Sequence, residues 1–497
     1  MHLFSLAQRL IAQGHKVIII THAYKDPVSK SKRTGVRYLN GPGPLKCYYC
    51  PIVPMTDQDA LPTFSSSLSI MRWIFIRERI EIVHAHQATS TLANESIAYA
   101  AELGIASVYT DHSLFGFDDL ASVILNRVMK ASLSTVNAII CVSHTCRENL
   151  IMRTNMDPTI VHAIPNAIDA SKFTPDPSKR CKERIKIVVI SRLVYRKGID
   201  LLVGIIPMIC SKFDNVDFII GGDGAKKLAL EEMVERERLQ SRVEFLGSVP
   251  HAEVRNVLVK GHIFLNCSLT ESFCIAILEA ASCGLFVVST EVGGVPEVLP
   301  EDLIFLSKPN IDELCNVVEK AINEKIECRH DEIKFHSSYN PIEAHERINR
   351  LYSWDRVASR TVKVYEAVLQ KKRLTLEQRL VRYRSVGPFS GYIVCLIALS
   401  SLSPTNKLHG GSIRDKMLKI STTSLQQTSL FEFGLVFCIK NTLHGLPISL
   451  LPLENSLLGN NIWSYICFKT TIKEVMSKVH NVIIWVMVNN SNIVIIS

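Results

Sequence analysis

The sequence predicts an α/β protein of two doubly wound domains that face each other across a cleft. Short apolar runs of strand length recur along the chain, helical stretches separate them, and the series restarts after one Pro-rich, charged break. At about 150 residues per domain, 497 residues suffice for two to four domains, and a hydrophobic fraction of 47% supplies sizeable cores. Ligands of such sheets bind beyond the carboxyl ends of the strands, which is where candidate site residues belong.

Composition excludes several classes of protein. The hydrophobic content rules out a collagenous or wholly disordered chain. A net charge of +9 is too small to indicate a nucleic-acid binder. The 14 cysteines are scattered, and the close pair Cys47 and Cys50 has no second pair at zinc-ribbon spacing. Free thiols in a reducing compartment are the better interpretation.

Residues 1–173 are predicted to form the first domain. Leu3, Leu6 and Leu10 follow helical spacing, and Lys16–Thr21 then reads as a buried strand. A doubly wound domain ordinarily opens on a strand, so the first strand is apparently missing. The helix Leu92–Leu103 lies among further expected strands at Ile80–Ala85, Ala106–Thr110 and Ala138–Val142.

Residues 174–184 (TPDPSKRCKER) are predicted to be a linker and residues 185–340 the second domain. Its expected strands are Ile185–Ser191, Val216–Gly221, Val243–Leu246, Ile263–Asn266 and Leu285–Ser289. After about Leu303 the pattern turns helical, through Asp312–Glu324 and Trp354–Leu369, and residues 341–390 are expected to be helices with a basic amphipathic stretch. Residues 391–497 hold a short apolar segment and an irregular, unassigned tail, and no run there reaches the ~20 apolar residues of a membrane helix.

The segment VVISRLVYRKGID, residues 188–200, is the strongest chemical signal. An apolar strand ends in a basic loop, and Gly198 opens a helix. Arg192 and Lys197 would lie at the carboxyl end of the strand, beside the positive end of that helix. The planar guanidinium of Arg192 and the compact ammonium group of Lys197 would suit a diphosphate there. A solvated loop of ordinary surface cations is the competing interpretation.

The segment TESFCIAILEAAS, residues 270–282, carries two carboxylates. Glu271 would lie in the turn and Glu279 on a helix expected over Phe273–Ser282. If the whole stretch were helical, the two would be roughly 12 Å apart along the axis. That is wide for an acid/base pair flanking one bond, at ~5–9.5 Å, and suits an extended ligand held at two places. As an isolated pair, ordinary helix-surface acids would be the better interpretation.

Glycine turns and histidines add weaker signals. Gly222, in Gly-Gly-Asp-Gly after a strand, permits close backbone approach to a ligand, and Gly293-Gly294 reads likewise. His112 follows a first-domain strand at the cleft end and could contact a reacting oxygen, although an isolated histidine is more often structural. His84 and His86 share one strand face, and packing is preferred because two histidines without a third ligand do not make a metal site.

Together these motifs carry a resemblance. The run SRLVYRKGID, GGDG, GHIFLNCSLTESFCIAILEAASCGL and VSTEVGGVPEVLP resembles the retaining glycosyltransferases of GT-B architecture, family four, with two facing Rossmann-like domains. The Glu-x7-Glu motif of that family matches Glu271 and Glu279. More narrowly, THAY, TDHSLFGF, ICVSHT, IPNAID and LYSWDRVASRTVKVYE resemble the catalytic subunits of phosphatidylinositol N-acetylglucosaminyltransferase, over about residues 1–395.

The resemblance implies transfer of N-acetylglucosamine from UDP-N-acetylglucosamine to phosphatidylinositol, the first step of glycosylphosphatidylinositol (GPI) anchor biosynthesis. It implies retention of configuration, no metal or other cofactor, the cytosolic face of the endoplasmic reticulum membrane, and further subunits as partners. By residue, it matches Arg192 and Lys197 to the donor diphosphate and Glu271 to the donor sugar. The other implied site residues are Phe273 and Cys274 in the phosphate-side turn, Glu279 at the ribose, Gly222 at the donor, and His112 near the transferred sugar.

Some alternatives stay open at the level of sequence. Another family-four transferase with a different donor or acceptor, or a shortened non-catalytic subunit, would carry the same donor motifs. Residues 371–384 hold six basic side chains against one acid, so Leu374, Val381 and these cations could lie on an anionic bilayer. A solvated charged helix is the equal alternative. The role of residues 401–497 cannot be read from sequence.

Overall fold

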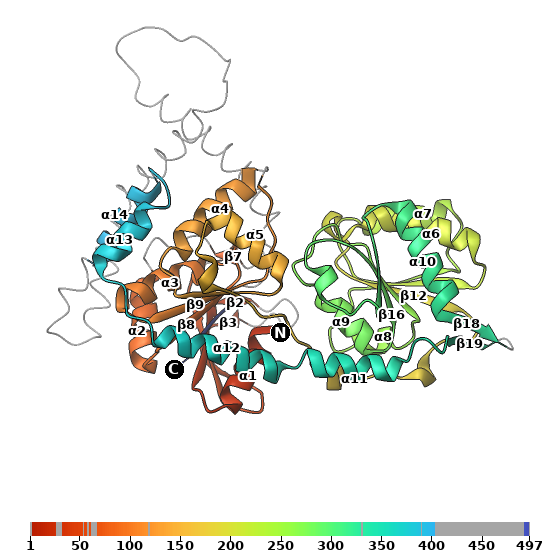
Figure 1. Cartoon of the computed structure of the whole chain (residues 1–497), viewed down its shortest axis with the longest axis horizontal. Helices are drawn as coiled ribbons and strands as arrows, with labels where there is room; N and C mark the ends of the chain where they lie inside the picture. The colour runs from red at the N-terminus through yellow and green to blue at the C-terminus, as the bar shows by residue number, and fades with distance from the viewer. Residues whose placement is uncertain are drawn as a thin grey trace, which may run out of the picture.

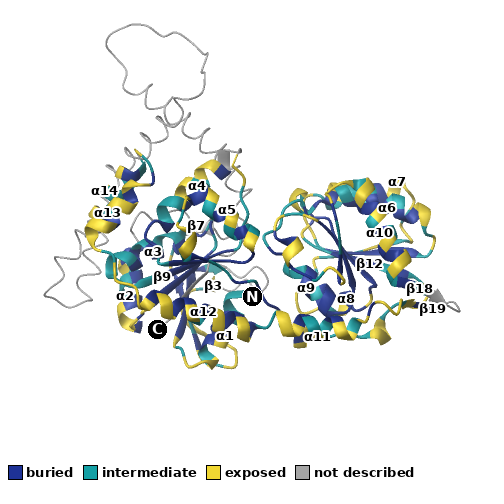
Figure 2. Ribbon diagram, viewed as in Figure 1, coloured by how far each residue is buried: buried dark blue, intermediate teal, exposed yellow. Residues whose placement is uncertain are grey.

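The computed structural model of the chain contains two α/β units, each built around its own sheet (Figure 1). It describes residues 2–25, 32–52, 54–56, 59–60, 67–117, 120–329, 332–388, 390–402 and 492–496. Most sheet strands are buried and the helices expose one side (Figure 2), as expected when helices cover both faces of a parallel sheet.

The first sheet has eight strands. In spatial order they are β11 (Val161–Ala163), β10 (Ala138–Cys141), β9 (Ala106–Asp111), β8 (Ile82–His86), β20 (Asn492–Ile496), β1 (Val17–His22), β5 (Leu45–Cys50) and β4 (Gly35–Leu39). The strands run parallel except for β20 and β4, which are antiparallel to their neighbours. The small hairpins β2 (Tyr24–Lys25) with β3 (Lys32–Arg33) and β6 (Pro54–Thr56) with β7 (Asp59–Ala60) stand apart from it.

Helices from both ends of the chain cover this sheet. They are α1 (His2–Ala12), α2 (Leu68–Glu78), α3 (Thr91–Leu103), α4 (Leu120–Leu133), α5 (His144–Thr154) and the late helix α12 (Trp354–Leu369). Leu6 and Leu10 of α1 share a buried cluster with Trp354 and Tyr365 of α12. The chain therefore leaves the first unit, builds the second and returns, which ties the two units together twice.

The second sheet is wholly parallel in its six strands. Their order is β14 (Val243–Gly247), β13 (Val216–Gly221), β12 (Ile185–Ile190), β15 (Ile263–Asn266), β16 (Phe286–Thr290) and β17 (Ile304–Ser307). The covering helices are α6 (Ile199–Lys212), α7 (Lys227–Arg236), α8 (Val254–Leu258), α9 (Ile275–Ser282) and α10 (Ile311–Lys325), and β18 (Ile326–Arg329) pairs with β19 (Glu332–Phe335). The strand order reverses between β12 and β15, so the carboxyl ends of these neighbouring strands form the expected ligand edge.

Three more helices complete the described chain. α11 (Pro341–Leu351) lies along the second unit and α12 along the first, and α13 (Leu376–Arg384) and α14 (Ser390–Leu402) form a pair beyond it (Figure 1). Thr375 caps α13 with a reciprocal capping box to Gln378. Among the described residues, none of the helices combines the length and apolar character needed to cross a bilayer.

The predicted architecture is confirmed, with three corrections. The expected helical pattern after Leu303 is wrong at β17, because Ile304–Ser307 adds an edge strand to the second sheet, and at the paired strands β18 and β19. The tail is not irregular throughout, since Asn492–Ile496 forms a strand between β1 and β8. The first sheet is mixed rather than parallel. The rest of the tail, residues 403–491 and 497, lies outside the described residues, and the predicted domain boundaries remain predictions.

Candidate functional site

The carboxyl ends of β12 and β15 bring a cation and a carboxylate together. Lys197 Nζ donates to Oε1 of Glu271, and Ser268 Oγ donates to the same oxygen at 2.9 Å. Both members of the ion pair are largely buried, with 23% and 12% of their side chains exposed. The sequence predicted Lys197 and Glu271 as separate ligand contacts, and the structure places them in one polar cluster.

Gly198 allows this cluster to form. Its φ is +66°, and a Cβ there would lie 1.7 Å from the carbonyl oxygen of Cys267. The carbonyl of the neighbouring Arg196 accepts from the Leu269 N–H at 2.9 Å. The short helical turn that carries Lys197 is thus pressed against the loop that carries Glu271, and only glycine fits between them.

Gly222 allows a similarly close approach between the loops that follow β13 and β12. Its φ is +142°, and a Cβ would lie 1.8 Å from the carbonyl oxygen of Ser191. The loop after β13 therefore packs directly on the loop after β12, where Arg192 lies with its side chain exposed. The predicted donor-side residues Arg192 and Gly222 consequently occupy adjoining loops at one sheet edge.

The predicted helix over Phe273–Ser282 begins later than expected. Cys274, with φ +66°, is the residue before α9, and Phe273 is buried against the ring of Tyr352 at a centroid distance of 5.9 Å. Burial raises the pKa of the Cys274 thiol, which keeps it neutral. Because residues 271–274 are not helical, the 12 Å spacing derived for an unbroken helix does not apply to the two glutamates.

Glu279 lies on α9 with a different partner from Glu271. His251 Nε2 is 3.1 Å from Glu279 Oε1, and 13% of the Glu279 side chain is exposed. Burial raises the pKa of Glu279, and the contact with His251 opposes this. The two carboxylates thus have different partners, and their contact with two parts of one ligand stays a prediction.

His112 follows β9 on a loop held by a buried ion pair. Arg153 Nη2 lies 2.6 Å from Asp111 Oδ2, with no part of either side chain exposed. Asp111 Oδ1 also accepts from the N–H of Ser113 at 3.2 Å. The Arg153 guanidinium stacks over the ring of Phe115 at 5.0 Å, so the whole loop is anchored to α5.

A histidine cluster surrounds His112 that sequence reasoning missed. His86 Nδ1 lies 3.2 Å from His112 Nε2, and the His2 ring meets the His112 ring edge-on at 4.7 Å. One ring nitrogen of each of these three residues lies within 4.8 Å of the other two, a grouping that could hold a cation. The expectation that His84 and His86 lack a third ligand is therefore wrong for His86, since α1 and the loop after β9 supply the others.

His84 has the packing role that the sequence predicted. Its Nδ1 is 2.6 Å from the Tyr365 hydroxyl and its Nε2 is 2.6 Å from Thr110 Oγ1, so both nitrogens have partners. The contact to Tyr365 joins the first sheet to α12.

Low pH should destabilise the fold through the imidazoles of His84 and His112. Burial lowers the pKa of His84 to about 3 and that of His112 to about 4, against about 6.5 when unfolded. The unfolded chain then binds more protons than the folded one, so the free energy of unfolding falls as pH drops from 6.5 towards 4. The slope is up to about 1.4 kcal/mol per pH unit for each histidine. Thermal unfolding of H84Q between pH 7 and 5 should show a shallower loss of Tm than the unsubstituted chain, and an equal loss would contradict the assignment.

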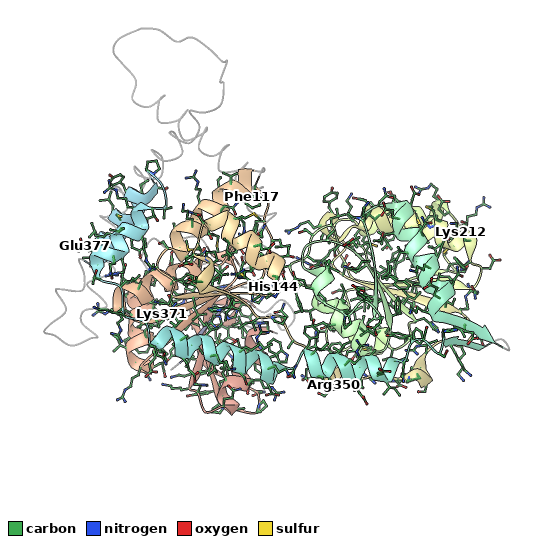
Figure 3. The ribbon with its side chains drawn as sticks, viewed as in Figure 1. Phe117, His144, Lys212, Arg350, Lys371 and Glu377 are labelled. Carbon is green, nitrogen blue, oxygen red and sulfur yellow. The ribbon has the colours of Figure 1, made fainter. Side chains whose placement is uncertain are left out.

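The two units meet at the loops that carry these residues. Ser272 Oγ donates to the carbonyl of His112 at 2.5 Å. Glu297 accepts from the N–H groups of His144 and Thr145 at 2.6 and 2.8 Å, at the amino end of α5. Figure 3 shows His144 on the side of the first unit that faces the second. The sequence flagged the Gly-Gly turn before Glu297 but not this contact between the units.

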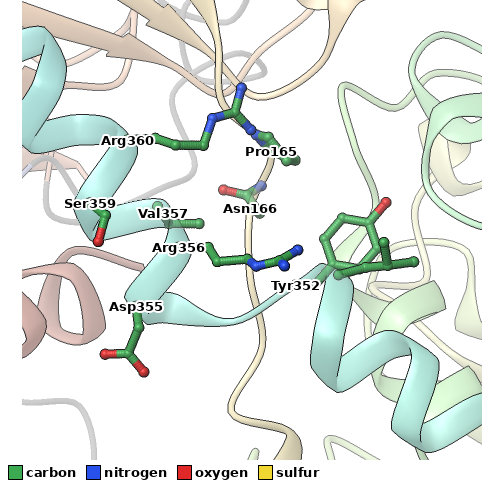
Figure 4. Close-up of a pocket in the computed structure, with 9 residues that line it drawn as sticks. Pro165, Asn166, Tyr352, Asp355, Arg356, Val357, Ser359 and Arg360 are labelled. Atoms are coloured by element: carbon green, nitrogen blue, oxygen red, sulfur yellow. The ribbon is translucent and has the colours of Figure 1, made fainter.

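A pocket of about 480 Å³ lies where the chain crosses between the units, away from the predicted site residues (Figure 4). It is lined by residues 165–166 and by the α11–α12 connection with the first turns of α12. Arg360 Nη2 donates to the carbonyl of Ala163 at 2.6 Å, and this hydrogen bond joins α12 to the end of β11. None of the predicted site residues lines this pocket.

Comparison with known proteins decides the family. Residues 28–119 match the family described as PIGA (GPI anchor biosynthesis), and residues 171–335 match the glycosyl transferases group 1 family. The chain is 49% identical over 399 residues to a phosphatidylinositol N-acetylglucosaminyltransferase subunit of Homo sapiens, covering 80% of this chain and 79% of that protein. It is 48% identical to the Arabidopsis thaliana protein of the same name, covering 80% and 85%. The chain belongs to this family of phosphatidylinositol N-acetylglucosaminyltransferase subunits.

Solved structures support the fold of this transferase family member. Sucrose-phosphate synthase from Thermosynechococcus elongatus superposes with a TM-score of 0.57 at 19% identity, covering 73% of this chain and 91% of that chain. A glycosyltransferase from Rickettsia africae gives 0.56 at 15% identity, covering 75% and 95%. At these identities the likeness establishes the two-domain glycosyltransferase fold alone.

Proposed function

We propose that this transferase family member moves N-acetylglucosamine from UDP-N-acetylglucosamine to phosphatidylinositol, the first step of GPI-anchor biosynthesis. The observation that carries the proposal is the 49% identity to the human transferase protein across 80% of the chain. The polar cluster of Lys197, Ser268 and Glu271 at the ligand edge of the second sheet supports it.

The chemistry requires charge stabilisation at the leaving group. The bond between the sugar C1 and the diphosphate oxygen breaks and UDP departs with the electron pair. An inositol hydroxyl forms the new C1–O bond and passes its proton to the departing phosphate oxygen. Lys197 and Arg192 are proposed to stabilise the departing diphosphate, so that no metal ion is needed. Glu271 is proposed to face the sugar, and the anomeric configuration is proposed to be retained. Turnover that is unaffected by a chelator would support the proposal that no metal ion is needed.

The first unit is proposed to present the acceptor. His112, held by the Asp111–Arg153 pair, lies against Ser272 of the second unit, where an acceptor hydroxyl would meet the donor sugar. Burial keeps this imidazole neutral at physiological pH, since its pKa is lowered to about 4, so it can accept a hydrogen bond from the hydroxyl. Contact between the units, including the Glu297 contact to α5, would hold the reactants together.

The acceptor is a lipid, so we propose that the enzyme works at the cytosolic face of the endoplasmic reticulum membrane. The relatives are named as subunits, which supports assembly with other chains. The predicted basic stretch over residues 371–384 forms the connection that follows α12 and then α13, and Val381 is exposed while Leu374 is half buried. Contact of this stretch with an anionic bilayer remains a proposal.

Removal of the Glu279 carboxylate should weaken nucleotide binding. If Glu279 accepts hydrogen bonds from ribose hydroxyls, E279A loses about 1.5–3 kcal/mol of affinity for UDP, roughly 10- to 150-fold. Isothermal titration calorimetry with UDP measures this directly. E235A, which removes an exposed acid of α7 in the same unit, is the control, and equal affinities of E279A and the unsubstituted chain would dismiss the ribose assignment.

Genetic complementation tests the proposal in cells. The full chain should restore surface display of GPI-anchored proteins in cells that lack the first step of anchor synthesis, as measured by flow cytometry, and K197A should not. Restoration by both chains would argue against a catalytic role, and restoration by neither, despite normal expression, against the proposed activity.

A further inference from the structure

The outer face of α4 is apolar and unusually free of acids. Val123, Ile124 and Val128 are exposed on it, and Phe117 is exposed on the loop that leads into it. No Asp or Glu occurs in α4, whereas Arg127 is exposed on the same face. Asp118 and Asp119 precede the helix and lie outside the described residues. Burying such a face in water-free surroundings is favourable, and a folded chain rarely leaves it open without a partner.

The face continues onto α13 and α14. Arg127 Nη1 lies 3.3 Å from the position of a Cβ on Gly387, in the turn that joins these two helices. Tyr392, Leu396 and Leu399 of α14 are exposed, as is Val381 of α13. Two surfaces with exposed apolar side chains therefore adjoin at Arg127.

Cations lie along one side of this combined surface, on α13 and the connection before it. Lys371, Lys372 and Arg373 precede α13, and Arg382 and Arg384 lie in its last turn, all exposed. Glu377 is the one acid of α13. Figure 3 shows Lys371 and Glu377 on the α12–α13 side of the first unit and Phe117 near α4. Exposed apolar side chains with a cationic border match the chemistry of an anionic bilayer surface better than that of a neutral protein partner.

The chain connects this surface to the reaction side. The loop that begins at His112 ends at Phe117, just before α4, so a short segment joins the proposed acceptor contact to the apolar face. Leu114 of the same loop approaches the second unit, 2.6 Å from the position of a Cβ on Gly293. A lipid whose chains stay in the bilayer could therefore present its headgroup to His112 from this side.

We propose that α4, with α13 and α14, docks the first unit on an anionic bilayer and that the loop His112–Phe117 receives the lipid headgroup there. This inference rests on the proposed function for the identity of the lipid. The docking itself rests on the apolar face and its cations.

Vesicle binding tests the docking. The full chain should co-sediment with phosphatidylcholine vesicles that contain phosphatidylinositol and much less with phosphatidylcholine alone. I124E/V128E places two carboxylates one turn apart on the face, at side chains 43% and 44% exposed, and should lower vesicle binding at least about tenfold. L228E/I342E, at positions 63% and 55% exposed in the second unit, is the matched control and should bind as the unsubstituted chain does. Equal binding by I124E/V128E, or equal binding to both vesicle types, would overturn the proposal.

Turnover separates the docking from the proposed activity. I124E/V128E should transfer sugar to phosphatidylinositol in vesicles at least about tenfold more slowly, yet keep its rate on a short-chain, water-soluble phosphatidylinositol and its affinity for UDP. Equal slowing on both lipids, with UDP affinity kept, would contradict a docking role. If UDP affinity is lost, I124S/V128S replaces the variant and the same criteria apply. Absence of product from the unsubstituted chain on either lipid would refute the proposed function, while the vesicle assay would still decide the docking.

Discussion

K197A should lower turnover by about 100- to 1000-fold at saturating donor, the largest effect we expect from one side chain. Lys197 is the cation held beside Glu271 at the carboxyl ends of β12 and β15, where the resemblance to family-four transferases places the donor diphosphate. Under the proposed mechanism, loss of this positive charge removes one of the two cations that stabilise the departing UDP, so the bond-breaking step should slow more than binding weakens. Steady-state rates at saturating UDP-N-acetylglucosamine provide the measurement.

Lys212 offers a matched control. It also pairs with a glutamate, Glu319, but on the outer surface of the second unit (Figure 3). K212A should retain its rate within about twofold, because surface ion pairs contribute little. A turnover number for K197A equal to that of K212A would remove Lys197 from the chemistry.

G198A should destabilise the second unit by about 3 kcal/mol or more, the largest expected effect on stability. A Cβ at Gly198 would lie 1.7 Å from the Cys267 carbonyl, so the backbone must move in addition to bearing the left-handed strain. Gly247 has nearly the same φ, +65°, with nothing within 4 Å of a Cβ, so G247A should cost only about 1–2 kcal/mol.

Comparing G198A with G247A separates the effect of the contact with the Cys267 carbonyl from the left-handed backbone strain that both variants share. Thermal unfolding followed by circular dichroism should show a distinctly lower Tm for G198A than for G247A, and G198A should also bind UDP more weakly because Lys197 precedes the altered residue. Similar Tm values for the two variants would show that the loops of Lys197 and Glu271 are not pressed together as described.

Local patterns in the sequence predicted the second unit closely. Continuous apolar runs such as Ile263–Asn266 and Val216–Gly221 are buried parallel strands with the same limits in the structure, because both of their faces are covered. The placement of Lys197 and Glu271 at strand ends followed from the same pattern. The start of α9 could not be predicted from this pattern. Cys274 adopts a φ of +66° in the turn before the helix, and cysteine is not a residue type that indicates such a turn.

Contacts between distant segments could not be predicted in this way. His2, His86 and His112 are separated by up to 110 residues in sequence and meet because the first residue of α1 lies beside the carboxyl ends of β8 and β9. Nothing in the Gly-rich turn around Glu297 indicates that its carboxylate accepts hydrogen bonds from the N–H groups at the start of α5 in the other unit. The pairing of Asn492–Ile496 between β1 and β8 likewise depends on a gap in a sheet formed by residues far earlier in the chain.

One assay tests the central claim most directly. The purified full chain, with any co-purifying subunits, is incubated with radiolabelled UDP-N-acetylglucosamine and vesicles that contain phosphatidylinositol. We expect label in a lipid that phosphatidylinositol-specific phospholipase C cleaves, and K197A should leave that lipid unlabelled. Label in a phospholipase-resistant lipid, or none from a chain that binds UDP, would contradict the account.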